Sequence, residues 1–239
     1  MRRFLPFAMV LILLAGISFF VCAAESTVSA EENEAREKLQ ELQEFIGTWE
    51  ANGGPDGKKG SVKGIWKETL TWNWRFKADA AWLALDVKGG KLFKSADLKW
   101  NPEKKSYEFT ALTPEGKKQV YEGTFKKDIL TLERLDSGTN ERIQISMNTA
   151  AEGVRMIYRV RKATGGGKLY SPQYLVQGNR EGESLAAKES KQLCVVSGGA
   201  GTMPISFKGE TFYVCCSGCR DAFNENPEKY IKEFKAKKK

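Results

Sequence analysis

The segment GIWKETLTWNWRFK, residues 64–77, alternates large apolar and polar side chains with a period of two. Its even positions carry mainly apolar residues, with Glu68 as the one exception: Trp66, Leu70, Trp72, Trp74 and Phe76. A period of two is the side-chain period of a β-strand, in which successive residues face opposite sides of the sheet. The segment therefore predicts a long strand with one buried, aromatic face.

Weaker alternations of the same kind recur along residues 46–180, and short turns separate them. The turns, such as KGGK, NPEKK and TGGGK, contain the Gly, Asn and Pro residues that supply the backbone angles of hairpins. Strands at this spacing with no helix between them form an antiparallel meander. Closure removes the exposed edges of such a sheet, so about ten strands predict a mainly β fold, an antiparallel up-and-down barrel over residues 46–180.

A charged segment precedes the first predicted strand. Residues 29–45 carry Leu39, Leu42 and Phe45 on one side of a helix whose other faces are polar. We expect an amphipathic helix over residues 25–45 that leads into the barrel and packs its apolar stripe against a neighbouring unit.

The sequence Gly47-Thr48-Trp49, directly after this helix, resembles the Gly-x-Trp motif at the closed end of lipocalin and calycin barrels. The resemblance spans residues 45–180, and this motif is its one local signature. It implies a barrel interior that can hold a small apolar ligand. The alternative is that the interior is filled by the aromatic side chains themselves, namely Trp66, Trp72, Trp74 and Trp82.

The first 24 residues have the pattern of a secretory signal peptide: two arginines, an apolar run through Val21 and then small residues. We expect cleavage after Ala23 or Ala24, and hence a protein exported to the bacterial envelope, periplasmic or secreted, with an envelope protein as a candidate partner. An uncleaved membrane anchor is the alternative. No later segment is apolar enough to span a membrane, so no stable membrane insertion is expected after cleavage.

Five cysteines occur in the chain, and four of them follow the signal peptide: Cys194, Cys215, Cys216 and Cys219. All four lie in residues 193–239, which a polar stretch at 181–192, interpreted as a linker, separates from the barrel. Export permits disulfides. A unit this small has too little core to be stable without a disulfide or a metal ion.

Local signals predict a small α+β module around these cysteines. The strands PISF and ETFYV flank Lys208-Gly209 as a hairpin, and Cys219 follows at the start of a helix. The turn at residues 197–199 lets backbone amides point towards the sulfur of Cys194. A helix N-terminus lowers the pKa of a nearby thiol, which favours the thiolate form.

The chain contains no histidine, so any metal site here must use mainly sulfur donors. Converging thiolates suit a soft or borderline heavy-metal ion such as zinc or copper(I). Adjacent side chains diverge on an extended backbone, so we expect only one of Cys215 and Cys216 to reach the same centre as Cys194 and Cys219. The preferred ligands are Cys194, Cys215 and Cys219, and the role of Cys216 stays open.

Residues 193–235 resemble the TRASH and YHS-type heavy-metal-binding modules of bacteria. Cys194 matches the first family cysteine, Cys215 and Cys219 match the Cys-x-x-x-Cys pair, and FKGETFYV, AF and NPEKY match the flanking elements. The resemblance implies metal sensing, trafficking or sequestration rather than catalysis. Cys216 is additional to the family pattern, and the histidine of some members is absent.

Two other interpretations of the cysteines remain open. Residues 216–219 read Cys-Ser-Gly-Cys at a helix start, which is a thiol redox motif, although no thioredoxin-like βαβ pattern surrounds it. Structural disulfides are the second interpretation.

Composition and motifs exclude several functional classes. Without histidine there is no Ser-His-Asp or Cys-His pair, and no phosphate-binding glycine loop occurs, so we expect no enzyme. The net charge is +8, but its lysines are interleaved with acids, so we expect no nucleic-acid binding. Two functions remain: thiolate-based metal binding, or binding of a small apolar ligand in a barrel whose Cys module is only a structural staple.

Overall fold

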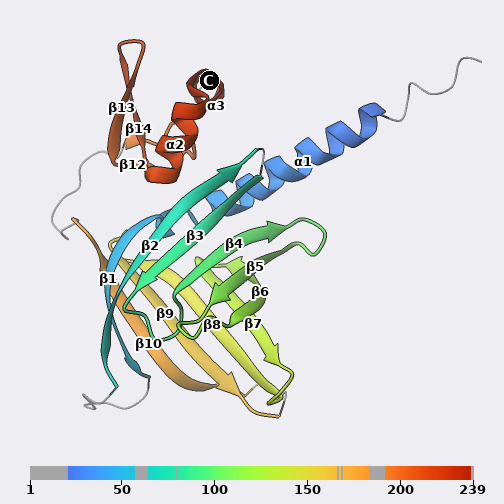
Figure 1. Cartoon of the computed structure of the whole chain (residues 1–239), viewed down its shortest axis with the longest axis vertical. Helices are drawn as coiled ribbons and strands as arrows, with labels where there is room; N and C mark the ends of the chain where they lie inside the picture. Colours follow the sequence, from blue (N-terminus) through green and yellow to red (C-terminus); the bar gives the residue numbers. More distant parts are fainter. Residues whose placement is uncertain are drawn as a thin grey trace, which may run out of the picture.

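The computed structural model describes residues 21–56, 64–78, 80–165, 167, 169–182 and 192–237, with the backbone alone for residues 21–30. The predicted signal peptide, except for residues 21–24, lies outside the described residues, as do residues 183–191 of the predicted linker at 181–192. The described part forms a barrel with a small C-terminal unit beside one of its ends (Figure 1).

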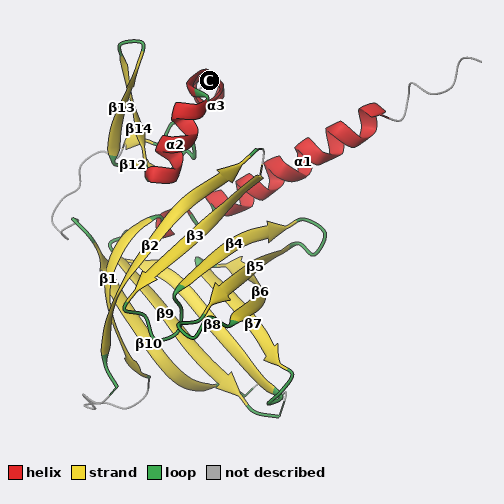
Figure 2. Cartoon of the chain, viewed as in Figure 1, coloured by secondary structure: helices red, strands yellow, loops and turns green. Residues whose placement is uncertain are grey.

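Ten antiparallel strands form a closed barrel in which each strand pairs with its neighbours in sequence (Figure 2). Strands β1 and β10 close the barrel, with Trp49 opposite Arg180. The mainly β, up-and-down barrel that the sequence predicts is therefore confirmed. Its strands are β1 (Gly47–Pro55), β2 (Trp66–Lys77), β3 (Ala80–Lys88), β4 (Ser95–Asn101), β5 (Ser106–Leu112), β6 (Lys118–Lys126), β7 (Ile129–Asp136), β8 (Glu141–Ala150), β9 (Arg155–Ala163) and β10 (Ser171–Arg180).

Strand β2 follows the predicted alternation, and its tryptophans Trp66, Trp72 and Trp74 are buried. Trp82 on β3 differs from the expectation that it belongs to the interior. Its indole lies on the outer surface and donates a hydrogen bond to Asp97 Oδ1 at 2.9 Å. The alternation around Trp82 is weaker than in β2, which explains why sequence placed it on the wrong face.

Glu68 is a charged residue on the otherwise apolar face of β2, and its side chain stays on that inward face. Carboxylates are usually exposed to solvent, but Glu68 is buried inside the barrel. Its two oxygens accept hydrogen bonds from the Trp66 indole at 2.5 Å and the Tyr158 hydroxyl at 2.6 Å. These donors offset the cost of removing the carboxyl group from water.

Helix α1 (Val21–Gln40) and the short 3-10 helix η1 (Gln43–Phe45) lead into the first strand. Helix α1 lies against β3 and β4 across one end of the barrel (Figure 1). The apolar residues that predicted this helix, Leu39, Leu42 and Phe45, are all buried. The packing of this stripe closes the end of the barrel from which β1 departs.

Arg180, the last residue of β10, joins the barrel to this end cap. Its guanidinium lies 4.1 Å from the centroid of the Trp49 ring. It also donates hydrogen bonds to the backbone carbonyls of Glu44, Ile46 and Gly153. One planar cation thus stacks on the tryptophan of the first strand and satisfies carbonyls at the end of η1 and in the β8–β9 turn.

The C-terminal unit contains short strands and two helices. Strands β13 and β14 form the predicted hairpin around Lys208-Gly209, and helix α2 starts directly after Cys216. Its elements are β11 (Gln192–Leu193), β12 (Ala200–Gly201), β13 (Met203–Phe207), β14 (Glu210–Val214), α2 (Ser217–Glu225) and α3 (Pro227–Lys237).

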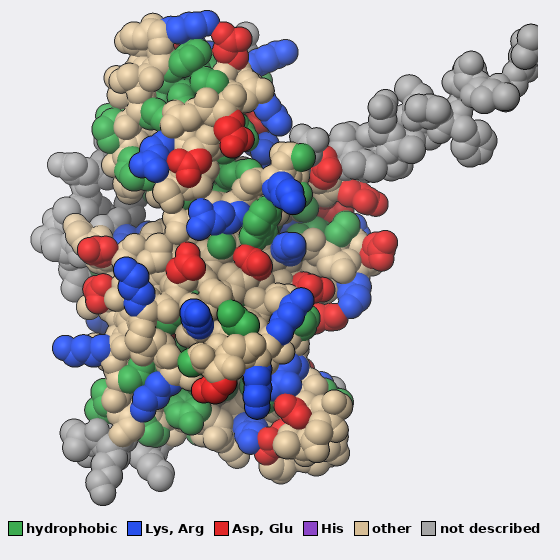
Figure 3. Space-filling view, viewed as in Figure 1, with side chains coloured by type: hydrophobic (Ala, Val, Ile, Leu, Met, Phe, Trp, Pro, Cys, Tyr) green, Lys and Arg blue, Asp and Glu red, His purple; other side chains and the backbone are tan. Residues whose placement is uncertain are grey.

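The face of the molecule in Figure 3 carries Lys and Arg side chains interspersed with Asp and Glu over both the barrel and the C-terminal unit. Exposed ion pairs of the described residues include Lys208 with Glu228 at 2.6 Å. Exposed pairs of this kind contribute little to stability but keep the surface hydrated.

Among the described residues, no helix combines the length and the apolar character that crossing a membrane requires.

We predict that Arg180→Lys lowers the free energy of unfolding by about 2 to 3 kcal/mol, because lysine cannot keep the planar stacking and the several hydrogen bonds together. Denaturant unfolding followed by tryptophan fluorescence measures the change. Arg161→Lys, on the exposed face of β9, is the matched control and should be nearly neutral. Equal effects of the two substitutions would contradict the assigned role of Arg180.

Candidate metal centre

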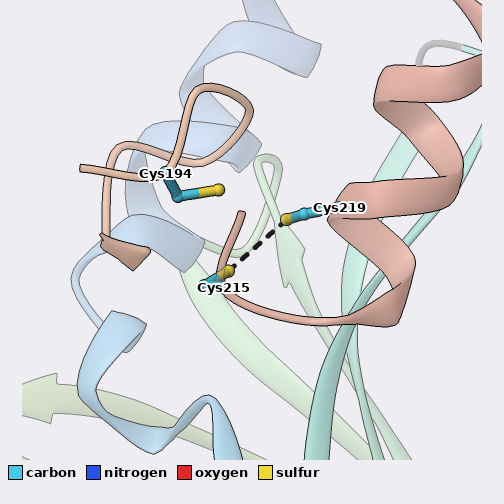
Figure 4. Close-up of side chains that lie close together, drawn as sticks. All are labelled: Cys194, Cys215 and Cys219. Atoms are coloured by element: carbon cyan, nitrogen blue, oxygen red, sulfur yellow. Dashed lines mark hydrogen bonds between the residues drawn. The ribbon is translucent and has the colours of Figure 1, made fainter. Parts of the chain in front are cut away.

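Three cysteine side chains converge in the C-terminal unit. The sulfur atoms of Cys194, Cys215 and Cys219 all lie within 4.8 Å of one another. Figure 4 shows them approaching from a loop, from the end of a strand and from a helix. Cys194 and Cys219 are fully buried, with 0% of their surface exposed. We call these three residues the thiol trio.

Cys194 opens a tight loop that runs to Gly199. Its backbone N–H donates to the Gly199 carbonyl at 2.7 Å, and the Gly198 N–H donates back to the Cys194 carbonyl at 2.9 Å. Gly198 has a φ of +78°, a conformation that favours glycine. The Ser197 N–H lies 3.4 Å from the Cys194 sulfur, as the sequence predicted for a backbone amide of this turn.

Cys215 and Cys219 come from the junction between β14 and α2. Cys215 follows the last residue of β14, and Cys219 lies in the first turn of α2, with 3.5 Å between their sulfur atoms. The Ser197 hydroxyl lies 3.4 Å from the Cys215 sulfur, which joins this junction to the loop of Cys194. A hairpin and one helical turn thus bring residues that are distant in sequence to one point.

Cys216 lies beside the trio and not within it. It occupies the N-cap position of α2 in an extended conformation, with φ of −160°. Its sulfur is 3.9 Å from that of Cys215, but it does not belong to the group whose sulfur atoms all lie within 4.8 Å of one another. The structure therefore brings Cys194, Cys215 and Cys219 together and leaves Cys216 adjacent.

The thiols share protons through mutual hydrogen bonds. Hydrogen bonds from Cys215 and Cys219 lower the pKa of Cys194, and the hydroxyl and amide of Ser197 add to this effect. The pKa of Cys215 is raised because its proton is donated towards Cys194 and Cys216. Burial is the main cause that raises the pKa of Cys219. A bound metal ion would replace the shared protons, because thiolates are the form that binds metals.

The spacing of the sulfur atoms suits a single metal ion. Two thiolates at about 2.3 Å from one zinc ion lie about 3.8 Å apart in a tetrahedral site. The Cys215–Cys219 distance of 3.5 Å and the 4.8 Å limit of the trio lie on either side of this value. None of the four cysteines forms a disulfide.

The N-terminus of α2 packs on an overhanging edge of the barrel. Strand β1 begins at Gly47 opposite Trp72, whereas β2 continues beyond that pair. The backbone of Trp74 is therefore not covered by β1, and its N–H donates to the sulfur of Cys216. The carbonyl oxygen of Trp74 faces Gly218, where an added Cβ would lie only 1.7 Å away. Glycine is required at this contact.

The loop of Cys194 is held from the opposite side by the N-terminal segment. The Gln40 amide donates to the Ser197 carbonyl at 2.7 Å. The Gln43 side chain accepts the Trp74 indole N–H at 2.9 Å and fills the space above Gly199, where an added Cβ would approach it to 1.9 Å. The end cap of the barrel therefore supports the loop that carries Cys194.

Sequence reasoning did not find Gln40, Gln43 or Trp74 as supports of the centre. Each contact joins positions more than thirty residues apart or crosses between the barrel and the C-terminal unit, and no local pattern encodes such a pairing. Gly218 carried a weak signal, because glycine is a poor residue for a helix interior and its presence in a helical first turn indicates a close approach.

No family model and no curated protein matches this chain. The resemblances to lipocalins and to TRASH and YHS modules therefore remain predictions. Among solved structures, the crystal structure of Rv2717c from M. tuberculosis is similar, with 17% sequence identity and a TM-score of 0.40 over 60% of this chain and 97% of that chain. A similarity of this size supports no conclusion about the site.

We predict that Gly218→Ala destabilises the packing of α2 on β2 by about 1 to 3 kcal/mol, because the new methyl group overlaps the Trp74 carbonyl. Denaturant unfolding measures the loss, and hydrogen exchange at the Trp74 amide reports the local opening. Gly54→Ala is the matched control, since a Cβ there meets its nearest atom, Ile65 Cγ1, at 3.6 Å. An unchanged exchange rate at Trp74 would contradict the contact.

Proposed function

We propose that this protein binds a soft or borderline heavy-metal ion, zinc or copper(I), through Cys194, Cys215 and Cys219. Its role would be metal trafficking, sensing or sequestration in the bacterial envelope, without catalysis. The observation that carries the proposal is the convergence of three largely buried, unbridged thiols within 4.8 Å of one another. The signal-peptide pattern of the first 24 residues supports the location.

The donor atoms favour soft ions. The trio offers sulfur alone, and no histidine exists in the chain to add a nitrogen donor. Thiolates prefer zinc and copper(I) over hard ions such as magnesium or calcium, which bind oxygen ligands.

The architecture of the C-terminal unit also gives a bound metal ion a structural role. Each trio residue belongs to a different element, namely the 194–199 loop, the end of β14 and the first turn of α2. The unit is small, and its apolar core consists of a few side chains such as Val214 and Phe223. One ion bound to all three sulfur atoms would join these elements. Units this small generally need such a cross-link to be stable.

We predict that Cys194→Ser and Cys219→Ser each weaken zinc and copper(I) binding at least about a hundredfold, because a hydroxyl is a poor substitute for a thiolate donor. Competition with chromogenic chelators under anaerobic, reducing conditions measures the affinity. Elemental analysis and free-thiol counting on the untreated protein test for a native metal. Ser206→Ala, on the exposed face of the hairpin, is the control.

Two results would argue against metal binding. One is a native protein without metal whose thiols are oxidised in pairs, which would support disulfides. The other is a Cys194→Ser variant that binds both ions as tightly as the unchanged chain.

A second candidate function is the binding of a small apolar ligand in the barrel. The observation that favours it is a cavity of about 320 Å³ at the barrel end opposite the α1 cap. Apolar residues line much of it, including Phe93, Tyr121, Ile145 and Val160. Barrel mouths of this kind are common ligand sites.

We predict that Ile145→Trp, which fills this cavity, abolishes binding of the apolar fluorophore N-phenyl-1-naphthylamine if the unchanged protein binds it inside the barrel. Fluorescence titration measures the binding. Ile157→Trp, on the outer face of β9, is the matched control and should bind as before. This cavity would be excluded as the ligand site if the unchanged protein bound no fluorophore, or if the two variants bound it equally well.

A further inference from the structure

A cleft of about 640 Å³ lies between the capped end of the barrel and the C-terminal unit. Its walls come from β1, β2, the β8–β9 turn and β13, and Cys215 and Cys216 line it together. Cys215 is the trio residue that is incompletely buried, whereas Cys194 and Cys219 are fully enclosed. An ion that travels through this cleft therefore meets the trio at Cys215.

Further soft donors line the same cleft. Cys216 is a lining residue, and its buried thiol lies 3.9 Å from the sulfur of Cys215. Met203, at the start of β13 and opposite Val214 in the hairpin, adds a thioether. Thioether and thiol ligands together select copper(I), since zinc seldom accepts a thioether.

The charge of the cleft also favours a cation. Three carboxylates line it, from Glu44, Glu152 and Glu181. Arg180 is the one basic residue among the described lining residues, so the acidic residues outnumber it three to one. Clustered acidic groups in a concave surface raise the local concentration of cations and their rate of association.

We propose that this cleft is the loading route for copper(I), in which Met203 and the adjacent thiols of Cys215 and Cys216 bind the ion first and Cys215 then passes it to the rest of the thiol trio. The proposal rests on the proposed function. It names copper(I) as the bound ion and the cleft as the path by which the ion reaches the trio. Cys216 is then a transfer ligand, which accounts for a fourth thiol beside a three-thiol site. Its position at the N-cap of α2 holds it next to Cys215.

The transfer is a ligand exchange without a change of oxidation state. The ion stays bound to the Cys215 thiolate while its bonds to the Met203 and Cys216 sulfur atoms break and bonds to the Cys194 and Cys219 sulfur atoms form. Protons displaced from the receiving thiols pass to water, and the released Cys216 thiolate takes one up. Copper remains in the +1 state throughout.

Rapid-mixing kinetics test the route. The copper(I) complex of bathocuproine disulfonate is mixed anaerobically with the reduced chain, and the loss of its absorbance gives the loading rate. We expect Cys216→Ser and Met203→Leu each to slow loading about tenfold or more while the equilibrium affinity stays within about twofold. Serine keeps an oxygen acceptor for the Trp74 amide, and leucine keeps the volume of methionine.

Two controls separate the route from general damage. Met156→Leu removes a thioether from the buried face of β9, away from the cleft, and should load at the unchanged rate. Zinc loading, followed with a chromogenic zinc complex as donor, should be insensitive to Met203→Leu. A Met203→Leu variant that slows both ions equally would overturn the copper-specific route.

The outcomes distinguish the loading route from the proposed function on which it rests. If the unchanged chain binds neither copper(I) nor zinc, or if Cys194→Ser binds both equally well, the proposed function fails. If the chain binds zinc but no copper(I), the proposed function stands and the copper(I) route is wrong. If the chain binds copper(I) through the trio but Cys216→Ser loads as fast, the route alone is wrong. If Cys216→Ser weakens the equilibrium affinity as much as the rate, Cys216 is a permanent ligand and the transfer role is overturned.

Discussion

The unequal lengths of β1 and β2 set the position of the metal centre. Strand β2 continues past the point where β1 begins, so the backbone of Trp74 has an unpaired edge. An uncovered edge with buried polar groups is costly. The N-terminus of α2 covers it, with the Cys216 sulfur as an acceptor for the amide and with Gly218 leaving room for the carbonyl. Cys215 and Cys219 flank these two residues, so their positions follow from this contact.

The other side of the centre depends on the end cap of the barrel. Gln40 binds the carbonyl of Ser197, and Gln43 packs over Gly199 while it accepts the Trp74 indole. The loop of Cys194 is thus fixed from outside before any ligand acts on it. Preorganisation of this kind reduces the ordering cost that a metal ion must offset when it binds.

Regular periodicity made the barrel predictable. The alternation in β2 is strong because Trp72 and Trp74 face inward and the lysines face water, and turn residues mark the hairpins on either side. The hairpin before Cys215 was predictable for the same local reason. These features depend on neighbours in sequence, which a single chain reveals directly.

The features that sequence did not reveal depend on distant partners. Glu68 lies inside because Tyr158, on a strand ninety positions away, donates to it. Trp82 lies outside because Asp97 on the next strand accepts its N–H. Within the cysteine cluster, the pattern indicated which residues carry sulfur, but the adjacent thiols of Cys215 and Cys216 do not diverge, because their sulfur atoms lie 3.9 Å apart. The support from Gln43 and the edge of β2 depends on tertiary packing, which no spacing encodes.

The packing of Gln43 has a consequence for how the chain can be divided. The side chain lies before the first barrel strand, yet it contacts both the tryptophan edge of β2 and the loop of Cys194. A boundary drawn between residues 182 and 192 would cut the chain where its sequence looks most separable and would remove this support from the sulfur centre. Transplanted alone, the cysteine segment would lack the surfaces that shape it.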